Sequence, residues 1–127
     1  MQENQLFEYA VIRIVPQVER EEFMNVGVVL YCSRQKFLQV LVRIDEQRLC
    51  AFSEKIDISE VAEYLNAFTQ ICAGGVGAGP IGNLPIAERF RWLTATRSTV
   101  VQTSKVHPGL CIDAAAMLSQ LYTQLVL

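Results

Sequence analysis

The sequence contains a single histidine and no Cys-x-x-Cys pair, and these two scarcities exclude much of the usual chemistry of protein sites. The four cysteines, Cys32, Cys50, Cys72 and Cys111, lack the spacing of metal ligands, and only His107 is present to join them. We therefore predict no metal site. Free thiols buried in apolar segments are the expected state of the cysteines, with a disulfide as the alternative.

A long apolar run and an excess charge of one sign are also missing. The 11 Lys and Arg residues nearly balance the 13 Asp and Glu residues, so no global field would attract nucleic acid or an anionic membrane. No run approaches the roughly 18 apolar residues that span a bilayer, and residues 1–15 carry acids rather than the basic start of a signal peptide. We expect a cytoplasmic protein without membrane contact.

Apolar residues, in contrast, are plentiful. They make up 51% of the 127 residues, and a chain of this length buries roughly two-thirds of its unfolded surface, so we predict one domain over residues 1–127. The apolar share is somewhat above that of an average globular domain, which favours a surface that a partner covers.

Hydrophobic periodicity and turn signals predict the elements. Strands are predicted over residues 7–15, 23–32, 37–44 and 98–104, and helices over residues 45–52, 57–74, 84–94 and 113–127. Asp57 and Asp113 occupy N-cap positions, and Gly74 occupies a typical helix end. This order is typical of an α+β protein: a mainly antiparallel sheet of about four strands, three N-terminal and one late, with helices packed on it.

Glycines raise two further questions. The stretch of residues 74–83 holds five of the seven glycines, but a helix precedes it and no G-K-[ST] follows, so a flexible connector is favoured over a phosphate-binding loop. Asn25 and Gly27 lie inside a predicted strand, where Gly indicates a bulge or the close approach of another backbone. A ligand that contacts the backbone at Gly27 is the alternative.

Arg13 is the first candidate site residue, because it interrupts an apolar strand. A guanidinium in such a place is costly unless it is paired or aimed at an anion. The structural alternative is a buried pair with Glu19, Glu21 or Glu22 in the following loop.

The late strand carries the second group of candidates. Its period of two places Ser98, Gln102 and Ser104 on one face, next to Arg97 in the sequence. That face is either solvated or, if it meets Arg13, part of a pocket for an anion or polar ligand.

His107 lies at the end of the same segment. It precedes Pro108 and Gly109, which suit the centre of a type II turn, and a lone loop imidazole is more often exposed or capping than a base. We assign no catalytic residue. Tyr9 and Trp92 would wall a pocket that formed here.

Three stretches, residues 9–16, 19–32 and 89–110, resemble a family of small bacterial proteins catalogued as domain-of-unknown-function family 3037. Glu21 and Glu22 stand where members often have Gly-Glu, so this loop departs from the family pattern. The resemblance implies a protein encoded beside a kinase-like protein related to the toxin kinase of persistence modules, and hence a partner role. The matching positions are Tyr9, Arg13, Pro16, Asn25, Gly27, Arg89, Trp92, Arg97, Ser98, Gln102, Ser104, His107 and Gly109.

Two functional hypotheses remain open, and neither requires a cofactor. The first is a cytoplasmic module that binds another protein, either the kinase-like protein or a second copy of itself. The second is a protein that binds or processes a nucleotide or another phosphate-bearing ligand. Its ligand-binding residues would be Arg13, Asn25, Arg97, Ser98, Gln102, Ser104 and His107.

Overall fold

A computed structural model describes residues 3–97 and 99–127 and contains five strands, five α-helices and two short 3-10 turns. The strands are β1 (Gln5–Ile14), β2 (Met24–Cys32), β3 (Phe37–Val42), β4 (Val101–Thr103) and β5 (His107–Cys111). The helices are α1 (Glu46–Phe52), α2 (Ile58–Ala73), α3 (Gly79–Gly82), α4 (Ile86–Leu93) and α5 (Ala114–Leu125), and the 3-10 turns are η1 (Val18–Arg20) and η2 (Val76–Ala78).

The strands form one antiparallel sheet in the order β3-β2-β1-β4, and β5 also pairs with β1. β5 lies along residues 5–9 of β1, and β4 lies along residues 12–14 on the same side. The predicted α+β class is therefore confirmed, with a fifth strand that the sequence did not predict. No helix in the described part of the chain is long and apolar enough to cross a membrane.

The fifth strand corrects the prediction of a turn at Pro108 and Gly109. Both residues lie within β5, which pairs only with β1, and proline is tolerated in such an edge strand. The ring of Phe7 packs on Gly109 so closely that a Cβ there would lie 2.5 Å from its Cζ. Gly109 is therefore required by side-chain packing inside the sheet rather than by a turn.

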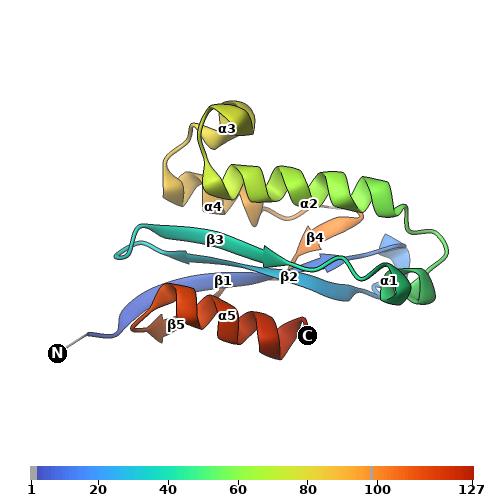
Figure 1. The fold of residues 1–127 in the computed structure, drawn as a ribbon, viewed down its shortest axis with the longest axis horizontal. Coiled ribbons are helices and arrows are strands. Elements are labelled where there is room, and N and C mark those ends of the chain that lie inside the picture. The colour runs from blue at the N-terminus through green and yellow to red at the C-terminus, as the bar shows by residue number, and fades with distance from the viewer. Residues whose placement is uncertain (1–2, 98) are drawn as a thin grey trace.

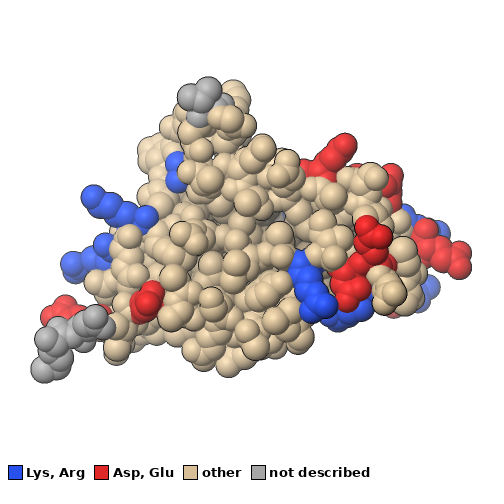
Figure 2. Space-filling model, viewed as in Figure 1, with Lys and Arg blue, Asp and Glu red and all other residues tan. Residues whose placement is uncertain are grey.

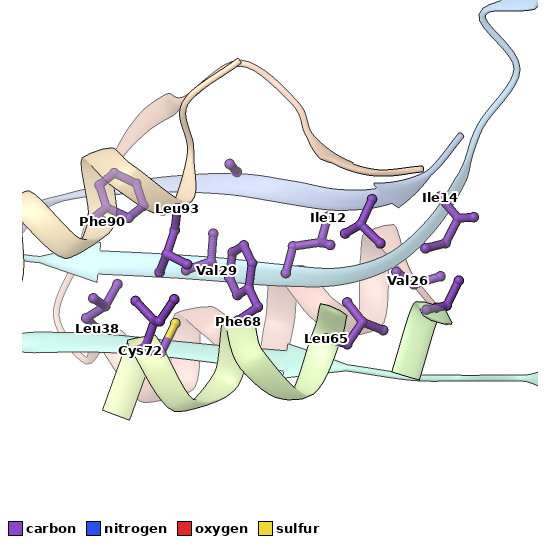
Figure 3. Close-up of a cluster of buried hydrophobic side chains, with 14 of the residues drawn as sticks. Ile12, Ile14, Val26, Val29, Leu38, Leu65, Phe68, Cys72, Phe90 and Leu93 are labelled. Atoms are coloured by element: carbon purple, nitrogen blue, oxygen red, sulfur yellow. The ribbon is translucent and has the colours of Figure 1, made fainter. Parts of the chain in front are cut away.

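Helices cover the sheet on both faces (Figure 1). α2 and α4 pack on one face, and α5 packs on the other over β2 and β3. In the larger core, Leu65, Phe68 and Cys72 point from α2 toward the sheet, and Phe90 and Leu93 come from α4 (Figure 3). In the central strand β1, Phe7 and Val11 are buried on one face, and Ala10, Ile12 and Ile14 are buried on the other.

The predicted helix caps are present. The side chain of Asp57 accepts a hydrogen bond from the Glu60 amide, and that of Asp113 accepts from the amides of Ala115 and Ala116. These bonds satisfy amides that have no partner inside the helix. Because Asp is a preferred N-cap residue, the sequence predicts the first residues of α2 and α5.

The irregularity predicted at Gly27 is a β-bulge. Ile12 faces Gly27 while Arg13 faces Asn25, so Val26 is an extra residue in β2. A Cβ on Gly27 would lie 2.7 Å from the carbonyl oxygen of Leu41, which confirms the close approach of another backbone. The alternative of a ligand at Gly27 is wrong, because β3 already occupies that space.

The glycine-rich stretch differs from the predicted connector. It folds into η2 and α3, with Gly74 ending α2 at a φ of 75°. Arg89 of α4 lies against Gly74 and donates to the carbonyl oxygens of Gly82 and Leu84 at 3.5 and 3.3 Å. The bond to Gly82 connects the glycine-rich stretch to α4.

Three of the four cysteines are buried free thiols, as predicted, but Cys50 is exposed. α1 buries only Leu49, so its neighbour on the helix faces water. Burial raises the pKa of Cys72 to about 12, although the nearby Arg89 charge acts in the opposite direction.

Charge is unevenly distributed on the face shown in Figure 2. Lys, Arg, Asp and Glu side chains gather toward the two ends and leave a broad uncharged middle. This face therefore carries no extended patch of one sign.

Candidate functional site

Arg13 lies in a row of three polar side chains that crosses the sheet. It faces Asn25 of β2 on one side and Gln102 of β4 on the other. Directly opposed residues of antiparallel strands project from the same face of a sheet, so the three side chains share one face. It is the face that α5 covers elsewhere, because the residue Phe7, six positions earlier on β1, belongs to the α5 core.

A hollow of about 380 Å³ opens beside this row. Arg13 and Gln102 form part of its lining, and Val18, Glu21 and Phe23 from the loop after β1 complete one side of it. Arg13 therefore lies beside Gln102, which is one residue of the polar face predicted for the late strand.

The guanidinium of Arg13 is held by stacking rather than by hydrogen bonds. Its Cζ lies 4.0 Å from the centroid of the Phe23 ring. Its Nε is buried, and no nitrogen of the side chain donates a hydrogen bond to any residue among 3–97 and 99–127. The predicted pair with an acid of the following loop is not formed, since Glu22 pairs with Arg20 and neither Glu19 nor Glu21 lies within ion-pair distance of Arg13.

The other two partly buried arginines, Arg89 and Arg97, and the exposed Arg91 have clear structural partners. Arg89 and Arg97 each donate to two main-chain carbonyl oxygens. Arg91 forms an ion pair with Glu8, and this hydrogen bond raises the pKa of the Arg91 guanidinium above its ordinary value. Among the partly buried arginines of the described chain, Arg13 is therefore the one without a hydrogen-bond or ion-pair partner.

Asn25 lies next to Arg13 but serves the fold. Its side-chain nitrogen donates to the carbonyl oxygen of Leu125 at 3.1 Å and so ties the end of α5 to β2. The side-chain oxygen is buried without a partner among the described residues. Asn25 lines a neighbouring hollow of about 270 Å³ rather than the Arg13 hollow, and Phe23 lines both.

Ser104 does not join the site. Its hydroxyl accepts a hydrogen bond from the Val11 amide and donates one to the Lys105 carbonyl oxygen, both at 2.9 Å. A serine hydroxyl has one hydrogen, so no donor remains for a ligand. Ser104 lies at a break in the sheet, where residues 104–106 face only residues 10–11 of β1.

His107 lies on the same face as Arg13 but at a distance. It pairs with Tyr9, and the centroids of the two rings are 5.4 Å apart. Tyr9 and Arg13 are four residues apart on an extended strand, which corresponds to about 13 Å. His107 therefore cannot share a small ligand with Arg13.

Arg97 lies outside the Arg13 hollow. Its two terminal nitrogens donate to the carbonyl oxygens of Leu93 and Trp92 and so cap the end of α4. It lines a separate hollow with Trp92, and Tyr9 is not part of that lining. Ser98, predicted to act beside Arg97, lies outside the described residues.

Phe23 and Glu21 belong to the site although the sequence did not single them out for it. Phe23 begins the predicted second strand, and in the structure it is 46% exposed and lies under the Arg13 guanidinium. An aromatic residue after a charged loop only weakly predicts stacking on an arginine. Whether the two side chains meet depends on where the loop returns to the sheet.

The fold and site define an α+β protein in which helices cover both faces of an antiparallel sheet and one partly buried arginine lines a hollow beside it. The family model described as "protein of unknown function (DUF3037)" matches residues 9–126, so the chain belongs to this family. No curated protein and no solved structure matches the chain.

Proposed function

We propose that the protein binds a phosphate-bearing ligand and that Arg13 holds the phosphate. The supporting observation is the guanidinium of Arg13, which is partly buried in a hollow and has no hydrogen-bond or ion-pair partner in the described chain. A cation in such a place is costly, and a phosphate supplies both the opposite charge and acceptor oxygens for the planar fork of nitrogens.

Two neighbours adapt the hollow for this ligand. Stacking on Phe23 restricts the guanidinium to one plane, so less side-chain freedom is lost when an anion binds. The Gln102 amide nitrogen donates one hydrogen bond to the Thr99 carbonyl oxygen at 2.8 Å. An amide group carries two hydrogens, so a second donor is available for an oxygen of the ligand.

Glu21 sets a limit on the affinity. It also lines the hollow, and its carboxylate repels a phosphate held by Arg13. Removal of this charge while the side-chain shape is kept should therefore strengthen binding.

The proposal is tested by thermal unfolding in potassium phosphate against potassium chloride of equal ionic strength. A ligand at 100 times its Kd stabilises the folded state by about 2.7 kcal/mol, so wild type should melt at a higher temperature in phosphate. Arg13→Ala should abolish this shift, Arg13→Lys should reduce it, and Glu21→Gln should enlarge it.

Arg34→Ala is the matched control, because Arg34 is an exposed arginine in the turn after β2 and contributes nothing to the hollow. It should behave as wild type. An equal phosphate shift in wild type and Arg13→Ala would reject the site. If Glu21→Gln instead lowers the melting temperature as much as Arg13→Ala does, the two residues form a structural pair in solution.

A protein partner is the second candidate function. Leu6 and Leu110 face each other across β1 and β5 and are 57% and 62% exposed, and the nearby Ile112 is also exposed. Adjacent exposed apolar side chains of this kind mark protein contacts. The partner that the family resemblance suggests is the kinase-like protein.

Co-expression with that kinase-like protein tests this candidate. Leu110→Lys should weaken the complex at least tenfold, because it places a charge in an apolar contact. Ile44→Lys, at an exposed apolar residue after β3, is the control and should leave the complex intact. A complex that Leu110→Lys does not weaken would exclude this surface.

A further inference from the structure

The outer edge of β3 is the regular edge of the sheet. β3 pairs with β2 on one side and with no described strand on the other. Residues 37–42 contain no proline, glycine or charged side chain. At the opposite edge, in contrast, residues 104–106 break the sheet and Pro108 lacks an amide hydrogen. Natural edge strands usually carry such interruptions, because an uninterrupted edge is a template for another strand.

Three residues of β3 direct their main-chain polar groups away from the sheet. The Arg43 amide donates to the Val26 carbonyl oxygen, so these two residues form a hydrogen-bonded pair. Along an antiparallel ladder such pairs alternate with pairs whose polar groups point outward. The amides and carbonyls of Leu38, Val40 and Val42 therefore face away from β2. No main-chain hydrogen bond joins them to another residue among 3–97 and 99–127.

A hollow of about 440 Å³ lies beside residues 36–40 at this edge. Its other walls come from the last turns of α2 and from Ile86 and Arg89 of α4. Leu38 and Val40 belong to the core under α2, so their side chains project on the α2 face of the sheet (Figure 1). Directly opposed residues of antiparallel strands share a face. Alternate side chains of a strand added to β3 would therefore enter the hollow.

The charges around the hollow select the chemistry of its occupant. Lys36 and Arg89 line it, and no Asp or Glu of the described chain does. Neither cation forms an ion pair with a described residue. A carboxylate on the added strand would supply the missing opposite charge. A second copy of β3 would not supply it, because residues 37–42 contain no acid.

We propose that the β3 edge binds an extended acidic segment of another protein by strand addition. The outward groups of Leu38, Val40 and Val42 form the main-chain hydrogen bonds, and the hollow takes acidic side chains at alternate positions. This surface is separate from the Arg13 hollow and from the exposed apolar residues of β1 and β5.

A short peptide of alternating valine and glutamate, blocked at both ends, is the probe. Its glutamates share one face, so they enter the hollow together when the chain is extended. Calorimetric titration at an ionic strength of roughly 0.15 M should show saturable binding. A peptide of alternating valine and glutamine has nearly the same shape without the charge, and it should bind at least tenfold more weakly.

N-methylation of the probe tests the main-chain hydrogen bonds. The residues opposite Leu38 and Val40 are those whose side chains enter the hollow, so the glutamate amides point toward β3. Methylation of the glutamate nitrogens removes these donors while the charges stay, and it should abolish binding. Methylation of the valine nitrogens, which point away from β3, is the matched control and should leave binding intact.

Lys36→Glu tests the charge of the hollow and should weaken binding of the valine-glutamate peptide at least tenfold. Arg34→Glu is the matched control, because Arg34 is exposed in the same turn but does not line the hollow. It should bind the peptide as wild type does. Arg13→Ala and Leu110→Lys should also bind normally, so failure of the other two proposed sites is a separate result.

Hydrogen exchange locates the bound peptide. Saturating peptide should slow exchange of the amides of Leu38, Val40 and Val42 at least tenfold and leave the amides of β5, at the opposite edge, unchanged.

Four outcomes would overturn the proposal. A valine-glutamate peptide that neither binds nor slows exchange would exclude the β3 edge as its site. Equal affinity for the glutamate and glutamine peptides would refute the acidic partner, and equal affinity for the two methylated peptides would refute strand addition. Slower exchange of the same amides on raising the protein concentration without peptide would assign the edge to a second copy of the chain.

Discussion

Ser104 and Arg13 are both polar residues in otherwise apolar strands, yet their surroundings give them different roles. The hydroxyl of Ser104 is buried and bonded to Val11 and Lys105 of the main chain, so its polarity is used inside the fold. The guanidinium of Arg13 has an aromatic platform but no acceptor in the described chain. Partner count, rather than residue type or burial alone, separates a structural polar residue from a candidate ligand contact.

A prediction at this scale concerns the Cys72 thiol. Its pKa is about 12 in the folded protein and 9.0 for an ordinary thiol, chiefly because of burial. Between these pH values the folded state keeps a proton that the unfolded chain has lost, so stability is fully present below pH 9 and falls as the pH rises toward 12. The loss attributable to this thiol is at most about 1.4 kcal/mol for each pH unit.

Urea unfolding of wild type and Cys72→Ala at pH 7, 9, 10 and 11 measures this effect. The variant is less stable at pH 7 because of its cavity, but its stability should fall less steeply above pH 9. Cys50→Ala, at the exposed cysteine, should keep the wild-type slope. Parallel curves for wild type and Cys72→Ala would contradict the prediction.

At the scale of elements, two irregularities of the sheet flank the same part of β1. Val26 is an extra residue in β2 opposite residues 12–13, and the segment 104–106 has one residue more than the two it faces in β1. Bulges increase the local twist and change the direction of side chains, and they are frequent next to binding sites. Arg13 lies immediately beyond both, where the strand leaves the region covered by α5.

Gly27→Ala tests whether the first bulge is essential to the sheet. The new methyl group would lie 2.7 Å from the Leu41 carbonyl oxygen and 2.8 Å from Cγ1 of Val42, so we expect a loss of about 1–3 kcal/mol in the free energy of unfolding. Gly77→Ala is the control, because a Cβ at Gly77 meets no atom within 4 Å, and it should change stability by less than about 0.5 kcal/mol. Equal melting temperatures for the two variants would show that β3 moves aside without cost.

At the scale of the whole molecule, two cores share one sheet. The α2–α4 core and the α5 core meet along β1 and β2, whose alternate residues point to opposite faces. α5 lies over β2 and β3 and leaves the β4 end of the second face open, which is where the Arg13 hollow lies. The site exists because one helix covers only part of a five-stranded sheet.

Much of this arrangement could be predicted from the sequence. The strands, the long helices and the caps at Asp57 and Asp113 follow from local periodicity and from polar residues at helix starts. β5 was missed because His-Pro-Gly has the composition of a turn, and only the Phe7 ring across the sheet explains a glycine within a strand there.

The sequence by itself determined the class of fold, the elements that build it and the anomaly of Arg13, because each depends on residues close together in the chain. Only the tertiary structure decided that Arg13 meets Gln102 and Phe23 but neither His107 nor Arg97. Strand register and bulges determine which distant residues become neighbours, and both are set by packing across the whole sheet.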